Sequence, residues 1–278
     1  MSEKKSFNLL FPEWQGYGEN QDVYHGAMHL CQHVTKNLQF STIDVHKEQT
    51  LSTKDAILGL NASLKLFDQA AAILEESNPN QIFMVGGTCA CEMAPVSYLN
   101  RRYDSDLAVL WFDAHGDLNT PESSPSGHLH GMPLRSLLGE GNQSILDRIK
   151  NTLTPQQVAM VGSRDLDVGE INYIEHNGLP VFGADISNGS EVIDFVKTRG
   201  FTNVYIHFDL DVLEPSEFPH VLVPTEDGMR VDAAIRTISE IRNNFSVVGM
   251  SVVEYCPKDG GGTEELRRLI HEGMGQAV

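Results

Sequence analysis

Two short segments of the sequence carry side chains that could bind metal ions together. In the first, Asp113, His115 and Asp117 occupy alternate positions, and in the second Asp209 and Asp211 are also two residues apart. Residues two apart in an extended chain point to the same side, so Asp113 and His115 can face one point, and Asp117 can join them as the chain turns. The second segment allows the same geometry.

Four carboxylates and one imidazole gathered in one place call for cations. Two ionised carboxylates a few ångströms apart repel by about 4 kcal/mol at a surface-like dielectric constant, so either their pKa values rise or cations neutralise them. Oxygen ligands with one nitrogen suit Mn²⁺, Mg²⁺, Fe²⁺ or Zn²⁺. Two such ions about 3.5 Å apart can hold a hydroxide between them. One Asp-x-Asp pair is a weak signal, but the two segments together predict a two-metal hydrolytic site.

Both segments directly follow short apolar runs of the kind that form buried strands. Six runs are apolar on both faces, as expected for a parallel sheet: Ile82–Val85, Leu107–Phe112, Val158–Val161, Leu179–Phe182, Val204–Phe208 and Val247–Val253. The spacing of apolar residues predicts helices over Thr53–Glu76, Ser190–Arg199 and Val231–Asn243. Alternating strands and helices predict an α/β fold, a three-layer αβα sandwich with a mainly parallel central sheet. No Pro- or Gly-rich linker divides the chain, so residues 1–278 are expected to form one domain.

Polar and metal-binding groups follow most of these predicted strands. Val85 is followed by the segment GGTCACE, Phe112 by Asp113, Phe208 by Asp209, and Val253 by Glu254. In an open α/β sheet, ligands bind at the carboxyl ends of the strands. We therefore expect these side chains to meet at one edge of the sheet.

The composition limits the classes of partner. Hydrophobic residues make up 41% of the 278 residues, and the formal net charge is -18. A surface this acidic should repel nucleic acid and anionic membranes. No signal peptide or membrane span is apparent, and the four cysteines suggest no regular disulfide framework. We expect a cytoplasmic protein that binds neither nucleic acid nor membrane.

Four ordered motifs resemble those of the ureohydrolases, the family of arginase, agmatinase and their relatives. The segments Trp111–Leu134, Val161–Glu170, His207–Pro215 and Gly249–Pro257 look specifically like the arginase branch. The resemblance implies the arginase-like fold and hydrolysis of a guanidino compound, arginine or a related guanidino acid, to urea and an amine. It also implies two Mn²⁺ ions, with the hydroxide between them attacking the guanidinium carbon, and assembly into a trimer or hexamer.

The resemblance assigns a role to each site residue. Asp113 and Asp209 would bridge the two ions; Asp117 would complete the first ion's ligands, and His115 with Asp211 those of the second. Glu254 would hold the guanidinium, Asp211 would carry a proton to the leaving amine, and His130 would exchange protons with solvent. The amino-acid end of the substrate would be bound by Ser126, His128, Asp167 and Glu170.

Two departures from the family pattern bear on this assignment. Where the family has Gly-Gly-Asp-His, this sequence has Thr88 and Cys89 in the last two places, so Cys89 stands where a histidine would bind the first ion. A thiolate is a soft ligand that prefers Zn²⁺ or Fe²⁺ to Mn²⁺, so the first site should be weakened or should take a different metal. His128 replaces an Asn that contacts the substrate carboxylate in the arginase branch. Cys91 could join in metal binding, respond to redox conditions or simply pack in the core.

Three functions remain open on the sequence. The first is an arginase-like amidinohydrolase. The second is an impaired relative that holds one ion or none and acts by binding or as a structural oligomer. The third is a metal hydrolase of another C–N bond, such as that of a formimino group.

Overall fold

The central feature of the computed structural model is an eight-stranded sheet in which every neighbouring pair of strands is parallel. The structure describes residues 5–48, 50–186 and 189–275. Across the sheet the strands are β2 (Ser41–Thr42), β1 (Ser6–Phe11), β5 (Gln81–Gly86), β10 (Ser246–Val253), β9 (Asn203–Asp209), β6 (Ala108–Phe112), β7 (Val158–Val161) and β8 (Val181–Phe182). The predicted mainly parallel α/β sheet is confirmed.

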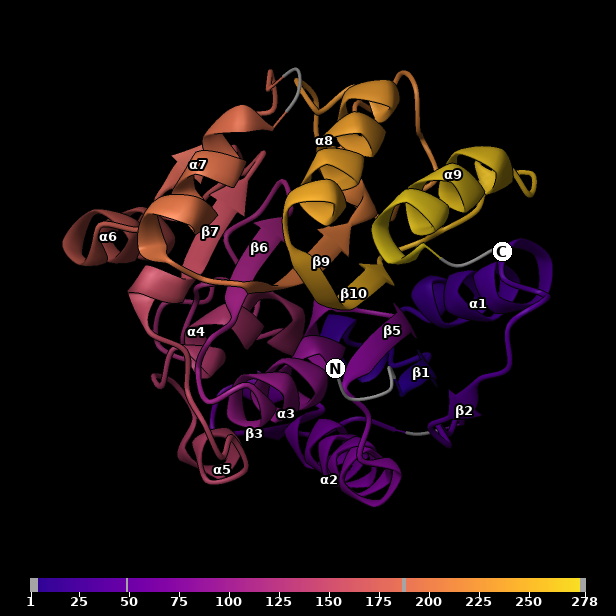
Figure 1. Cartoon of the computed structure of the whole chain (residues 1–278). Helices are drawn as coiled ribbons and strands as arrows, with labels where there is room; N and C mark the ends of the chain where they lie inside the picture. Colours follow the sequence, from indigo (N-terminus) through magenta and orange to yellow (C-terminus); the bar gives the residue numbers. More distant parts are fainter. Residues whose placement is uncertain (1–4, 49, 187–188, 276–278) are drawn as a thin grey trace.

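Helices cover both faces of this sheet (Figure 1). One face carries α1 (Asp22–His29), α7 (Ser190–Arg199), α8 (Val231–Asn244) and α9 (Thr263–Met274). The other carries α2 (Leu60–Ser77), α3 (Met93–Arg102), α4 (Pro133–Leu137), α5 (Gln143–Leu146) and α6 (Val168–Asn177).

Strand periodicity explains how one sheet supplies two cores. Along β5, Ile82 and Met84 pack toward α2 and α3, whereas Phe83 and Val85 pack toward α1, α8 and α9. Successive side chains of a strand point to opposite faces. A strand buried on both faces therefore reads as an uninterrupted apolar run, which is the pattern that the sequence shows.

The helix predicted to start at Thr53 starts at Leu60 instead. Thr53–Lys54 (β3) and Ile57–Leu58 (β4) form an antiparallel hairpin. Its turn residues Asp55 and Ala56 have φ angles of 50° and 59°, values that belong to the left-handed region and cannot continue a right-handed helix. Ile57 lies in this hairpin and is fully buried, so this residue is apolar because it packs in the core and not because it lies on a helix face.

No helix within residues 5–48, 50–186 and 189–275 combines the length and the apolarity that crossing a bilayer requires.

Candidate metal centre

Four adjacent strands end at the same edge of the sheet and deliver the predicted ligands there. In the order β5, β10, β9 and β6, they are followed by Cys89, Glu254, Asp209 with Asp211, and the segment that begins at Asp113. Parallel strands all point their carboxyl ends the same way, so residues far apart in sequence converge. Asp113, Asp209, Asp211 and Glu254 are each at most 5% exposed.

The donor atoms form three overlapping groups, each with its atoms within 4.8 Å of one another. Asp113 belongs to two of the groups, which is the position of a carboxylate shared by two ions. The groups are Cys89 with Asp113, Asp117 and His207; Cys89 with Asp209 and Glu254; and Asp113 with His115 and Asp211.

His115 is held between two carboxylates. Its Nδ1 lies 3.0 Å from Asp211 Oδ2 and 3.4 Å from Asp113 Oδ1. Burial lowers the pKa of His115, but the hydrogen bonds and charges of Asp113 and Asp211 outweigh it and hold that pKa far above its usual range. Burial likewise raises the pKa of Asp113, yet His115 and His207 together keep it below its usual range.

The remaining carboxylates lack such compensation. Burial, followed by the charges of neighbouring carboxylates, raises the pKa values of Asp117, Asp209 and Glu254 well above the usual range. The buried Asp117 Oδ2 finds no hydrogen-bond partner in the part of the chain that the structure describes. A divalent cation would satisfy this oxygen and neutralise the repulsion, so the residues present fit metal ions.

Unusual backbone conformations aim two of these acids at the site. Asp117 has φ of 54° and Glu254 has φ of 61°, both in the left-handed region that non-glycine residues rarely adopt. The strain is offset by fixed neighbours: Glu254 N donates to Gly87 O at 2.8 Å, and Arg135 N donates to Asp117 O at 3.1 Å. Such conformations occur mainly where function requires a side chain in one direction.

Cys89 reaches the ligand cluster that its position in the motif predicts. Its Sγ lies 3.0 Å from Asp209 Oδ2, to which the thiol donates, and 4.0 Å from Asp113 Oδ2. Burial and then the charges of Asp117, Asp209 and Asp113 raise the pKa of this thiol. Without a metal the sulfur therefore keeps its proton at neutral pH. Cys91 is buried in the hydrophobic core between the sheet and the helices α2 and α3, and its thiol donates to Thr88 O at 2.9 Å.

His207 also belongs to this cluster, although the sequence motifs assigned it no role. Its ring stacks on Trp111 with centroids 3.7 Å apart, and its Nε2 lies 3.5 Å from Asp113 Oδ2. Burial lowers the pKa of His207, but the charge of Glu92 and the contact with Asp113 raise it to about 9. The sequence did contain a sign of this position, because His207, Asp209 and Asp211 occupy alternate positions in the chain.

A hollow of about 160 Å³ opens beside the cluster. The predicted ligands His115 and Asp117 line it, together with the predicted substrate-binding or catalytic residues Ser126, His130, Asp167 and Glu170. His128 lies next to this rim, with its ring 6.0 Å from that of His130 and 5.8 Å from that of Tyr17. The structure thus brings most of the predicted substrate-binding residues to one opening.

Asp167 and Glu170 also hold the local backbone. They form the capping box of α6, in which Asp167 N donates to Glu170 Oε2 at 2.9 Å. Glu170 Oε1 accepts from Leu118 N at 2.9 Å, next to Asp117, and Asp167 accepts from Asn119 Nδ2 at 2.8 Å. Both oxygens of Glu170 therefore have backbone donors, and its position fixes the loop that carries Asp117.

His130 has an environment that disfavours its charged form. Burial, then the charges of His128 and His115, lowers its pKa to about 3. Burial also lowers the pKa of His128. His130 is therefore neutral when the hollow is empty, and its exchange of protons with solvent stays a prediction.

Glu13 supports the strand turn that carries Thr88 and Cys89. It accepts from Gly16 N at 2.6 Å and Ser63 Oγ at 3.2 Å, and a short hydrogen bond joins it to the Thr88 hydroxyl. Burial raises the pKa of Glu13 to about 7, with these three hydrogen bonds opposing the shift.

Glu13→Gln should therefore flatten the pH dependence of stability. Between the ordinary pKa of 4.5 and about 7, the folded protein binds more protons than the unfolded chain, so wild-type unfolding free energy falls as pH rises through this window. Gln cannot ionise, so the variant gains relative to wild type by at most about 3 kcal/mol at pH 8 compared with pH 4.5. Urea unfolding with a chelator present measures this, with exposed Glu175→Gln as control. A difference that does not vary with pH would contradict the prediction.

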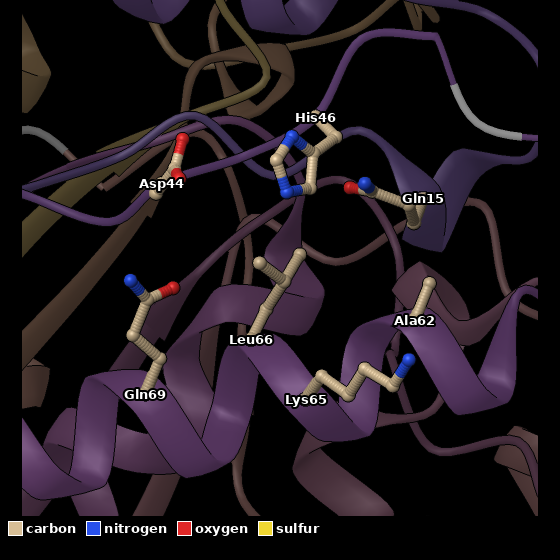
Figure 2. Close-up of a pocket in the computed structure, with 7 residues that line it drawn as sticks. All are labelled: Gln15, Asp44, His46, Ala62, Lys65, Leu66 and Gln69. Carbon is tan, nitrogen blue, oxygen red and sulfur yellow. The ribbon is translucent and has the colours of Figure 1, made fainter.

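A separate hollow of about 300 Å³ lies against α2, between Lys65, Gln69 and the segment with Asp44 and His46 (Figure 2). Its lining carries one carboxylate and one imidazole. The donor set at the strand ends is much richer, so that edge is the candidate site.

Sequence and structure comparisons agree with this geometry. A model of the Arginase family matches residues 21–270. The arginase of Staphylococcus aureus (strain MRSA252) is 32% identical over 232 residues, which cover 80% of this chain and 75% of that protein.

Solved structures of similar fold include two arginases. The Entamoeba histolytica arginase in complex with L-ornithine superposes with a TM-score of 0.88 at 23% identity, covering 99% of each chain. The native arginase of Bacillus caldovelox superposes with a TM-score of 0.87 at 22% identity, covering 99% of this chain and 100% of that one. These two likenesses establish the three-dimensional arrangement.

Proposed function

The chain belongs to the arginase family, and from that premise we propose that it hydrolyses a guanidino amino acid, arginine or a close relative, to urea and an amine. The observation that carries the proposal is the ligand cluster at the strand ends. There Asp113 is shared by two groups of donors, one of which consists of Asp113, His115 and Asp211.

Two divalent ions, Mn²⁺ among them, would be held by Asp113, His115, Asp117, Asp209 and Asp211, and would supply hydroxide at neutral pH. The guanidinium carbon is a poor electrophile because its positive charge is delocalised, so activation of water is what the reaction most needs. Ala114 N donates to Asp211 Oδ1 at 3.0 Å and Asp211 N donates to Asp209 Oδ1 at 2.8 Å. These bonds fix both carboxylates in place before substrate arrives.

Glu254 is proposed to hold the guanidinium. It is 5% exposed, and burial and neighbouring carboxylates raise its pKa. A planar guanidinium cation beside it would favour its ionised form and donate a paired, bidentate hydrogen bond to its two oxygens. Cys89 N donates to Glu254 Oε1 at 3.3 Å, which orients the carboxylate.

Glu254→Gln should lower kcat/KM by roughly 10- to 100-fold, because a hydrogen bond to a charged partner is worth about 1.5–3 kcal/mol. Gln keeps the size of the side chain, so metal content should not change. Initial rates at several substrate concentrations measure the effect, and Glu175→Gln on exposed α6 is the matched control. If kcat/KM stays within twofold of wild type, Glu254 does not hold the guanidinium.

Proton transfer is proposed to involve Asp211 and His130. Asp211 would carry a proton toward the leaving amine. His130, neutral in the empty hollow, would relay to solvent the proton that is released when the next water ionises. Ser126, His128 and Asp167 would contact the amino and carboxylate groups of the substrate, and Glu170 would act through the loop it fixes.

The function is tested by a substrate panel. Purified protein with Mn²⁺, Fe²⁺, Co²⁺ or Zn²⁺ is assayed for urea with arginine, agmatine and shorter guanidino acids, and for formamide with formimino compounds. Urea from an amino-acid substrate supports the proposal. Product from formimino compounds alone would replace it with hydrolysis of that C–N bond, and no product with any metal would favour the binding or structural alternative.

We also propose a cytoplasmic oligomer of three or six copies, as the family resemblance implies. Light scattering on the purified protein gives the number of copies, and a monomer at micromolar concentration would contradict the proposal.

A further inference from the structure

We propose that His207 is a metal ligand, and that with Cys89, Asp113 and Asp117 it forms a site of one nitrogen, one sulfur and two oxygens that selects Zn²⁺, Co²⁺ or Fe²⁺ over Mn²⁺. In this chain the imidazole of the first ion's site would thus come from β9, while position 89 supplies a thiolate. The inference shares with the proposed function only the premise that metal binds at this edge.

The geometry of the four donors is the first support. Their ligand atoms lie within 4.8 Å of one another and all four residues are buried. They are held by the ends of β5, β9 and β6 or the turns that follow these strands, so the sheet itself sets their separation. A set of four donors that includes nitrogen and sulfur matches, in number and type, the sites in which Zn²⁺ is four-coordinate.

The second support is the state of the His207 ring. It is fully buried, and among the described residues no hydrogen bond of good geometry reaches either of its nitrogens. Its Nε2 faces Asp113 at 3.5 Å, which is beyond good hydrogen-bond distance. Burying a polar nitrogen without a partner is costly, and a cation shared with Asp113 would remove that cost.

The third support lies behind the ring. Glu92 Oε1 is 3.1 Å from His207 Nδ1, and Tyr205 donates its hydroxyl to Glu92 Oε2 at 2.6 Å. Metal-binding histidines usually present their second nitrogen to a carboxylate, which fixes the ring and strengthens the ligand. Trp111 stacks on one face of the His207 ring and holds its orientation. The His207 ring therefore has the Glu92 carboxylate at one nitrogen and the other proposed ligands at the other nitrogen.

The ligand types set the metal preference. A thiolate is soft and favours Zn²⁺, Fe²⁺ and Co²⁺, whereas oxygen-rich sites suit Mn²⁺. The neighbouring group, Asp113 with His115 and Asp211, contains no sulfur. The two sites should therefore differ in metal selectivity although they share Asp113.

Cobalt reports on the sulfur ligand directly. Titration of wild-type metal-free protein with Co²⁺ should produce a thiolate-to-cobalt charge-transfer absorption in the near ultraviolet. Cys89→Ser should abolish it, and Cys91→Ser should leave it. The absence of this absorption in wild type, or its survival in Cys89→Ser, would overturn the proposal.

The role of the imidazole is tested by a matched pair of variants. His207→Gln should weaken binding of the sulfur-ligated Co²⁺ by roughly 100-fold or more, and Glu92→Gln by about 10- to 100-fold, whereas His115→Gln should keep this ion and lose the other. Binding within threefold of wild type in His207→Gln would refute the proposal.

If His207→Gln does not fold, the His115→Gln protein still decides the question. X-ray absorption of its zinc form should show one sulfur and one imidazole on the same ion, and oxygen with sulfur alone would overturn the inference. Metal content is measured without substrate, so a protein that binds both ions as described yet releases no urea contradicts the proposed function and leaves this inference standing.

Discussion

Replacing Asp113 by Asn will remove at least one metal ion and reduce urea formation by about 10²- to 10³-fold or more, because metal activation of water is worth several kcal/mol. Asp113 is the carboxylate that two donor groups share, and Cys89 also belongs to two groups. Its Oδ1 also accepts from His115 N at 2.7 Å and its Oδ2 from Trp111 Nε1 at 3.3 Å. Asn keeps the shape of the side chain and removes the charge on which both ions depend.

The matched control is Asp106→Asn, which changes the same residue type just before the amino end of β6. Asp106 accepts from Thr202 N at 2.9 Å and lies far along the strand from the site. This variant should keep both ions and its activity. Elemental analysis and the urea assay measure both effects, and full metal content with normal turnover in Asp113→Asn would refute the shared-ligand role.

In the metal-free protein, the ionised forms of Asp113 and Asp117 should have opposite effects on the free energy of unfolding. The pKa of Asp113 is lowered, despite burial, by His115 and His207, so its ionised form stabilises the fold above its unfolded pKa and Asn loses that contribution. The pKa of Asp117 is raised by burial and by Asp113, so its ionised form destabilises the fold at neutral pH. With a chelator present, Asp113→Asn should lower Tm and Asp117→Asn should raise it. Asp117 is thus retained at a cost in stability, as expected for a residue kept for function.

The strands and the ligand motifs could be predicted from sequence because each depends on local pattern. A strand buried on both faces must be apolar at every position, and Leu107–Phe112 shows this without reference to the rest of the chain. The hairpin at Thr53–Leu58 could not be predicted in this way. Its apolar residues fit a helical spacing, and only the left-handed turn at Asp55 and Ala56 distinguishes it.

The partners of His207 were beyond sequence reasoning for a different reason. Tyr205 lies on β9 two residues before His207, but Glu92 and Trp111 come from two other elements, and nothing in the sequence spacing links these two to His207. Their meeting depends on the order β9–β6 and on the turn after β5, which are properties of the sheet. The structural role of Glu170 was hidden similarly, because its donor Leu118 N belongs to a loop 52 residues away in the sequence.

Cys89→His should shift the metal preference of the first site toward Mn²⁺, with Mn²⁺ affinity at pH 7 rising by roughly tenfold or more. Two effects add. Imidazole replaces a soft thiolate, and the competition from protons falls. The ordinary thiol pKa of 9.0 is already two units above pH 7, and burial with the neighbouring carboxylates raises it further, so a metal must displace a tightly held proton. An imidazole has an unperturbed pKa of about 6.5, well below that of a thiol, so it imposes a smaller cost of this kind.

Crowding is the competing effect, because Cys89 is 2% exposed and the new ring must share the cluster with His207. The double variant with Cys89→His and His207→Ser avoids this crowding. It has an imidazole in the turn after β5 in place of the one on β9, so the number of rings in the cluster is unchanged. Competition between Mn²⁺ and Zn²⁺, followed by elemental analysis, should show the double variant binding Mn²⁺ relatively better than wild type does. If wild type and both variants have the same Mn²⁺ to Zn²⁺ ratio, the sulfur of Cys89 does not contact the ion. In that case the two carboxylates of this site, Asp113 and Asp117, set its metal preference.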